Sequence, residues 1–194
     1  MIKYILILIF LFSSPVIAEF NKADVNSFIE YMHNEYSYDK SELRSLFDDI
    51  KPESRIKKFF KRAPERTLTW NGCGQKDKKC TNYKNLFITN KNIYNGLEFW
   101  KNNHLALKRA ESIYGVPPEI IVAIIGIESK YGKRTGTFKT FDTLASLSLG
   151  PNKGRRAKFY KSELINFLLM CQENQLDPSR VKGSYAGALG MPQF

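Results

Sequence analysis

Residues 116–132 read VPPEIIVAIIGIESKYG, and they contain the clearest structural signals in the chain. Pro117 and Pro118 have fixed φ angles that suit the first turn of a helix, and the negative charge of Glu119 suits the positive end of a helix dipole. Every position from there to residue 127 is apolar or glycine. Because a helix that is apolar on all sides is normally buried on all sides, we expect a central, buried helix here. Gly126 weakens such a helix, so we expect it to permit a close contact.

Glu128 is a carboxylate at the end of this apolar run. It follows Ile121, Ile124 and Ile125 at helical spacing, which predicts that it continues a buried stripe. It also lies near the negative end of the helix dipole, and both effects favour the protonated carboxylic acid. An acid that keeps its proton near neutral pH is suited to general acid catalysis. The alternative is a glutamate that reaches solvent at the helix end and pairs with Lys130, and the pattern leaves both interpretations open.

The composition describes a globular chain with a strong positive charge. The chain has 194 residues, of which 43% are apolar, and this is enough for a domain with a real core. The formal net charge is +11, from basic residues that are spread along the chain. Such a charge favours an anionic partner, which could be nucleic acid, anionic lipid or cell-wall glycan.

Residues 1–18 have the features of a secretory signal peptide. Lys3 supplies a positive start, the apolar run at 5–12 is too short to span a membrane, and the small residues before Glu19 suit cleavage after Ala18. No lipobox cysteine follows the apolar run. We therefore expect a periplasmic product, and an uncleaved membrane anchor is the alternative.

Residues 19–62 predict an N-terminal helical segment. Their apolar residues repeat at helical spacing, which is typical of amphipathic helices. Asp39 and Glu42 match a capping box, and Pro52 should end the helix that this box begins.

Residues 97–114 predict one further helix. It should stop at Gly115, just before the two prolines, so that it forms a hairpin with the helix that follows. His33, upstream, is expected at the surface because no second candidate ligand lies close by in sequence. His104 on this helix could be a proton carrier, but without a partner in reach we expect it at the helix surface. Shorter helices are expected at 141–149 and from about 160 to 171. No β-strand pattern persists, so the sequence predicts an all-α, mainly helical fold.

Two cysteines lie in the glycine-rich and charged stretch at 63–89, which predicts an exposed loop. In an exported protein, Cys73 and Cys80 can close a small disulfide loop. Zinc binding is the less favoured alternative, because no histidine or second cysteine pair lies nearby. Cys171 lies on an apolar helix face, where we expect a buried free thiol.

Several motifs resemble one known family. They lie in the same order at 114–121, 126–132 and 167–170, and at 182–190 with Gln193 and Phe194. These residues are similar to those of the membrane-bound lytic murein transglycosylase B family, and the likeness covers about residues 63–194 well and the N-terminal helices loosely. The resemblance implies a lysozyme-like, mainly helical domain with a groove for glycan strands. It also implies cleavage of the bond between N-acetylmuramic acid and N-acetylglucosamine in peptidoglycan.

The same resemblance implies which residues form the site. Glu128 matches the family's single catalytic glutamate. Ser184 and Gln193 would lie in the groove as polar contacts, and Tyr185, Met191 and Phe194 could line it. The family uses the C6 hydroxyl of the substrate in place of a second carboxylate, and it leaves a 1,6-anhydromuramoyl end. Asp142 is therefore expected to be structural.

The resemblance also sets the expected organisation and partners. After the signal peptide at 1–18 and the N-terminal helical segment at 19–62, it implies a partial lysozyme-like domain at 63–194. Family members continue beyond residue 194 with more of the groove wall and often a calcium-binding loop, and no cofactor is required for the reaction. The expected partners are peptidoglycan strands, without nucleic acid or stable membrane insertion. An inactive peptidoglycan-binding remnant is the alternative function, and the export signal disfavours a nucleic-acid binder.

Overall fold

The computed structural model describes the chain except for residues 1–19, 51, 54, 62–67, 71–80 and 152–153. The described part is mainly helical, as the sequence predicts. Its helices are α1 Lys22–Tyr36, α2 Lys40–Asp48, α3 Ile56–Lys61, α4 Tyr83–Phe87, α5 Asn90–Asn102, α6 His104–Tyr114, α7 Pro118–Ser129, α8 Thr140–Ser148 and α9 Ala157–Glu173. Two pairs of very short strands join them, with β1 (Leu68–Thr69) parallel to β2 (Thr81–Asn82) and β3 (Phe138–Lys139) antiparallel to β4 (Lys182–Gly183).

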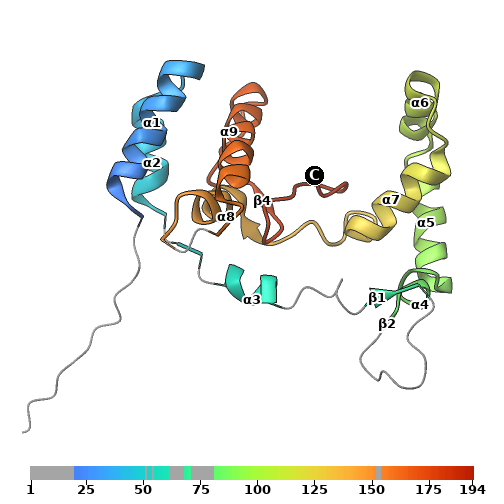
Figure 1. The fold of residues 1–194 in the computed structure, drawn as a ribbon. Helices are drawn as coiled ribbons and strands as arrows, with labels where there is room; N and C mark the ends of the chain where they lie inside the picture. The colour runs from blue at the N-terminus through green and yellow to red at the C-terminus, as the bar shows by residue number, and fades with distance from the viewer. Residues whose placement is uncertain (1–19, 51, 54, 62–67, 71–80, 152–153) are drawn as a thin grey trace, which may run out of the picture.

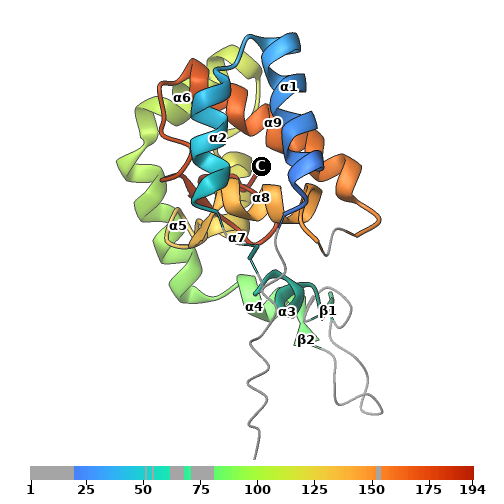
Figure 2. The ribbon, with the colours of Figure 1, turned by 90° about the vertical axis from the view of Figure 1, so that its left-hand side faces the viewer.

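The helices form two groups, with β3 and β4 near their junction (Figure 1). Helices α1, α2, α8 and α9 stand together in both ribbon views, and we call them the core group (Figure 2). Helices α5, α6 and α7 form the second group, which we call the α5–α7 group. The apolar centre of the core group is made by Phe28, Ile29, Met32, Leu43, Phe141, Leu144, Leu164 and Leu168. The N-terminal helices therefore share one hydrophobic core with α8 and α9.

Local signals explain where several helices begin and end. The side chain of Asp39 accepts a hydrogen bond of 2.8 Å from the Glu42 N–H, so the predicted capping residue does begin α2. Gly115 adopts a left-handed conformation with φ of 68°, and it ends α6 at the predicted position. Pro118 is the first residue of α7, where its missing N–H removes no helical hydrogen bond.

The predicted single helix over 97–114 is wrong in one respect, because Asn103 divides it into α5 and α6. The Asn103 side-chain amide donates a hydrogen bond of 2.8 Å to the Phe99 carbonyl oxygen, which competes with continuation of the helix. The expected irregular loop at 63–89 also contains α4. Here Asn82 caps the helix by accepting a hydrogen bond from the Asn85 N–H.

The prediction that α7 is buried on all sides is also wrong. Ile120, Ile124 and Ile127 are 49%, 44% and 43% exposed, and Val122 and Ser129 are the buried residues of this helix. Helix α7 makes its main contacts with α5 and α6, which cover one side of it. The error arises because apolar composition does not tell how many elements pack against a helix.

No single helix among the described residues is long and apolar enough to cross a membrane. Helices α6 and α7 meet that test only as a pair bent by 116°.

The predictions for the three cysteines have different outcomes. Cys171 is fully buried in α9 as a free thiol, which confirms the prediction, and burial raises the pKa of its thiol to about 11. Cys73 and Cys80 lie outside the described residues, so their disulfide stays a prediction. The predicted signal peptide at 1–18 also lies outside them.

Thr143 in α8 provides a test of the core. Its side-chain hydroxyl is buried and has no hydrogen-bond partner among the described residues. Burying an unpaired hydroxyl is unfavourable, so Thr143→Val should raise the free energy of unfolding by about 1 kcal/mol. Urea denaturation would measure this change, with Thr137→Val in an exposed loop as the control. A lower stability for Thr143→Val would contradict the prediction.

Asp142, expected to be structural, provides a second test. Burial raises the pKa of its carboxyl group above the usual range, and the nearby charge of Lys139 opposes this only in part. A carboxyl group whose pKa is raised by folding contributes stability below its unfolded value, and that contribution is lost as the pH rises through the folded value. Asp142→Asn should therefore gain melting temperature over the wild type at about pH 7, and the gain should shrink toward about pH 3. Thermal melts at both pH values would measure this, and a gain that is larger at the low pH would contradict the expected sign.

Candidate active site

Glu128 lies in the last turn of α7 and is exposed. It follows Ile120 and Ile124 at spacings of four residues, so it ends an exposed apolar stripe on this helix. The expectation that Glu128 continues a buried stripe with Ile121, Ile124 and Ile125 is therefore wrong. Within the described part of the chain, no hydrogen bond or ion pair holds its carboxylate, and the alternative pairing with Lys130 is not formed.

The C-terminal segment, residues 183–194, reaches the site by crossing the loop that follows α7. Gly136 has a φ of 97°, and a Cβ atom there would lie 1.9 Å from the Gly183 carbonyl oxygen and 2.5 Å from the Ser184 nitrogen. The two backbones are thus in direct contact, and only glycine fits at residue 136. The adjacent pairing of Phe138 with Gly183, between β3 and β4, extends this contact.

Two further contacts hold the C-terminal segment on the same loop. The Gln193 Nε2 donates hydrogen bonds to the carbonyl oxygens of Thr135, at 3.3 Å, and of Gly190, at 2.7 Å. A Cβ atom placed on Gly132 would lie 3.2 Å from the Met191 Sδ, so the two residues are in close contact. The structure therefore brings Ser184, Met191 and Gln193 against the loop that begins two residues after Glu128.

The Ser184 hydroxyl is already used to shape the C-terminal segment. It accepts hydrogen bonds from the N–H groups of Ala186, at 3.2 Å, and Ala188, at 3.0 Å. A hydroxyl oxygen has two lone pairs, and both already accept these hydrogen bonds. Its O–H is the group that remains to donate a hydrogen bond to a ligand. Ser184 can thus act as a hydrogen-bond donor in the site.

Tyr185 has an aromatic neighbour that the sequence did not indicate. Its ring stacks on that of Phe59 in α3, with centroids 5.3 Å apart and an angle of 17° between the planes. Phe59 also meets the Phe138 ring edge-on at 5.3 Å, and the Arg55 guanidinium lies 4.6 Å from the centre of Phe138. The segment around α3 therefore packs against the site from the N-terminal half of the chain. Long-range ring pairs of this kind have no signal in sequence spacing.

Gln193 and Phe194 also line a cavity of about 680 Å³ beside α9. Its wall is mainly apolar and includes Phe159, Tyr160 and Phe167 of α9. Phe194 is 85% exposed. The structure therefore places Phe194 at an open apolar surface, next to the contacts of Gln193.

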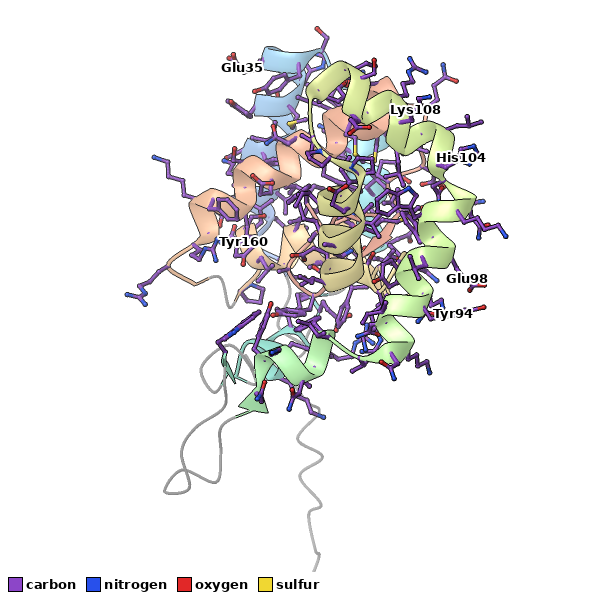
Figure 3. The ribbon with its side chains drawn as sticks, turned by 90° about the vertical axis from the view of Figure 1, so that its right-hand side faces the viewer. Glu35, Tyr94, Glu98, His104, Lys108 and Tyr160 are labelled. Carbon is purple, nitrogen blue, oxygen red and sulfur yellow. The ribbon has the colours of Figure 1, made fainter. Side chains whose placement is uncertain are left out.

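The histidines lie away from this arrangement. Figure 3 shows His104 with Tyr94 and Glu98 on the outer side of α5 and α6, pointing away from α7. His104 and His33 are both exposed. The His104 Nδ1 lies 3.2 Å from the Lys101 carbonyl oxygen, and the His33 Nδ1 lies 3.0 Å from the Tyr38 carbonyl oxygen. Their expected surface positions are confirmed.

Tyr131 is a second residue that the sequence did not indicate. A Cβ atom placed on Gly126 would lie only 2.7 Å from the Tyr131 side chain. This confirms the predicted close contact at Gly126. Gly96 in α5 makes the matching contact on the other helix, at 2.8 Å from the tyrosine oxygen. A glycine inside a helix is unfavourable, so the argument that singled out Gly126 could also have found Gly96.

Comparison with known proteins places this arrangement in a family. Residues 20–194 match the family model described as the transglycosylase SLT domain. The chain is 38% identical over 174 residues to membrane-bound lytic murein transglycosylase B of Escherichia coli strain K12. The aligned region covers 90% of this chain and 47% of that protein.

Solved structures agree with this assignment. The Escherichia coli lytic transglycosylase Slt35 in complex with calcium has a TM-score of 0.76 and 35% identity, over 94% of this chain and 55% of that one. The soluble lytic transglycosylase SltB1 from Pseudomonas aeruginosa has a TM-score of 0.75 and 36% identity, over 88% of this chain and 53% of that one. The described residues of the present chain contain no group of three or more His, Cys, Asp or Glu side chains that could hold a metal ion.

The present chain spans about half the length of these relatives. The match of the family model nonetheless extends over nearly all of it, and the fold is the lysozyme-like, mainly helical fold that the sequence predicted. The chain belongs to the transglycosylase SLT domain family.

Proposed function

We propose that the chain is a lytic transglycosylase that cleaves the bond between N-acetylmuramic acid and N-acetylglucosamine in peptidoglycan. One observation supports this above others. Glu128 ends an exposed apolar stripe on α7, and the C-terminal segment with Ser184 and Gln193 is held against the loop that follows it. A carboxylic acid beside an open surface, in a member of this family, suits attack on a polymer.

The proposed reaction uses Glu128 twice. As the acid, it donates its proton to the glycosidic oxygen, and the bond between that oxygen and C1 of the muramoyl residue breaks. As the carboxylate, it then accepts the proton of the C6 hydroxyl while O6 bonds to C1. The products are a 1,6-anhydromuramoyl end and a free N-acetylglucosamine hydroxyl. Because the substrate supplies the nucleophile, no second carboxylate is needed, unlike in two-carboxylate glycosidases.

The surroundings of Glu128 suggest how the glycan would assist. A strand bound along the stripe of Ile120 and Ile124 would remove water from the carboxyl group, which the free chain leaves exposed. The Ser184 O–H could donate to an N-acetyl carbonyl oxygen. The Gln193 Nε2 already donates to two backbone carbonyls, so its Oε1 is the atom that would accept a hydrogen bond from the sugar. The net charge of +11 would favour approach to an anionic wall polymer.

Binding without turnover is a second candidate. The exposure of Glu128 favours it, because catalytic groups are usually held in place by neighbouring side chains. In this case the chain would bind peptidoglycan strands through the same surface and release no product.

We also propose that the chain acts in the periplasm after export. The signal features of residues 1–18 support this, together with the cell-wall polymer proposed as the substrate. Mass spectrometry of the chain recovered from the periplasmic fraction should give an N-terminus at Glu19. An intact or lipid-modified N-terminus would contradict the proposed processing.

Glu128→Gln tests the reaction, since glutamine keeps the shape of the side chain but cannot exchange the proton. General acid–base catalysis contributes about 10²- to 10⁴-fold, and we expect a loss at the upper end because one group serves both steps. The assay is digestion of purified murein sacculi, with released muropeptides read by mass. The wild-type chain should release 1,6-anhydro products, each lighter by one water than the hydrolysis products of lysozyme.

Glu119→Gln is the matched control, because this exposed glutamate lies at the other end of the same helix. It should keep the wild-type rate. Full activity in Glu128→Gln would remove the residue from the mechanism, and reducing-end products from the wild type would make the enzyme a hydrolase. Wild-type chain that sediments with sacculi but releases nothing would establish the second candidate.

A further inference from the structure

We propose that Tyr131 is a positioning residue for Glu128, and this inference rests on the function proposed above. The ring of Tyr131 is wedged between Gly96 of α5 and Gly126 of α7, and it fixes the last turn of α7 from which Glu128 projects. We call this arrangement the tyrosine wedge. It would set the direction of a carboxylate that nothing else in the described structure holds.

The need for such a device follows from the surroundings of Glu128. Its side chain is exposed, and in the described residues it has neither a hydrogen bond nor an ion pair. Catalytic groups are usually held by neighbours, since small displacements slow the reaction strongly. The position of Glu128 must therefore come from the backbone of α7 at this point.

That backbone has an uncommon conformation directly after Glu128. Lys130, Tyr131 and Gly132 have φ angles of 51°, 60° and 80°, so three consecutive residues lie in the left-handed region. Residues with a Cβ atom rarely adopt this region, and they keep it only where surrounding contacts compensate. The Ser129 hydroxyl supplies one contact, by accepting a hydrogen bond of 3.0 Å from the Gly132 N–H and donating one of 3.2 Å to the Ile125 carbonyl oxygen.

The tyrosine wedge supplies the contacts that reach a second helix. The Tyr131 hydroxyl donates a hydrogen bond of 2.9 Å to the Asn92 carbonyl oxygen in the first turn of α5. Burial raises the pKa of this phenol above its usual range, so the hydroxyl remains a donor. The Phe99 ring lies beside it, with centroids 5.8 Å apart. The end of α7 is thus tied to α5 by a ring, a hydrogen bond and two close backbone contacts.

Both glycines lie against the tyrosine oxygen, but only Gly126 also lies tightly against ring carbons, and this difference gives a sharp test. A Cβ atom at Gly96 would lie 2.8 Å from the tyrosine oxygen and 3.3 Å from Cζ. One at Gly126 would lie 2.7 Å from the tyrosine oxygen, 2.7 Å from Cζ and 2.8 Å from Cε1, so it would still meet both ring carbons after the oxygen is removed. Removing the hydroxyl should therefore make room for alanine at residue 96 but not at residue 126.

The experiment compares Gly96→Ala and Gly126→Ala, each alone and combined with Tyr131→Phe. The substrate is a soluble glycan fragment prepared from purified murein, and kcat, KM and the melting temperature are measured for the full chain. We expect Gly96→Ala to lower kcat by about 10²-fold with little change in KM, because a displacement of about 1 Å has such an effect on rate. Addition of Tyr131→Phe should restore most of the kcat to Gly96→Ala and none to Gly126→Ala.

Gly154→Ala is the control, since a Cβ atom there would meet nothing within 4 Å, and it should leave kcat unchanged. A merely structural role for Tyr131 would lower the melting temperature in Gly96→Ala with no selective loss of kcat, and that result would overturn the proposal. Equal rescue of both glycine variants would overturn it as well.

A second readout keeps the proposal separate from the proposed function. If the wild-type chain releases no product, the proposed function fails, and the tyrosine wedge is then judged by NMR of the ¹³C-labelled Glu128 carboxyl group, assigned with Glu128→Gln. This signal should move in Gly96→Ala and return in the double variant with Tyr131→Phe. A signal that does not move in Gly96→Ala would show that the wedge does not position Glu128.

Discussion

The direct contact between the backbones of Gly136 and Gly183 is the constraint on which the site depends. No side chain separates them, since even a Cβ atom at residue 136 would overlap the Gly183 carbonyl oxygen. At this point the loop that leaves the α5–α7 group crosses the segment that leaves the core group (Figure 1). The Thr140 N–H adds a hydrogen bond of 2.9 Å to the Val181 carbonyl oxygen close by. Because of this crossing, Ser184 lies against the loop that follows Glu128, although the two residues are far apart in sequence.

Local chemistry made part of this fold predictable. The cap at Asp39, the stop at Gly115 and the start at Pro118 each depend on neighbours within a few residues, and each was found from the sequence. The exposure of α7 could not be found in this way, because it depends on which distant elements pack against the helix. Gly126 is an intermediate case: the sequence indicated a close contact, but the partner, Tyr131, could be identified only from the folded chain.

The N-terminal half of the chain packs against the candidate site as well as contributing to the core. The Glu53 N–H donates a hydrogen bond of 2.8 Å to the Ser146 hydroxyl of α8, which anchors the segment before α3 on the core group. From there the chain leads to Phe59, whose ring stacks on Tyr185. The sequence resemblance was looser in this half and therefore gave no indication of this role. The candidate site thus has walls from three separate parts of the chain.

The burial of Cys171 has a consequence for how the chain would mature in an oxidising compartment. Three thiols allow three different pairings, and the core around α9 closes off the two that involve Cys171. Before that core has formed, however, all three thiols are accessible, and a bond from Cys171 would keep α9 from packing. The predicted pairing of Cys73 with Cys80 would then depend on the order of two events, collapse of the core and oxidation of the thiols. The yield of mature protein would be set by the ratio of these two rates.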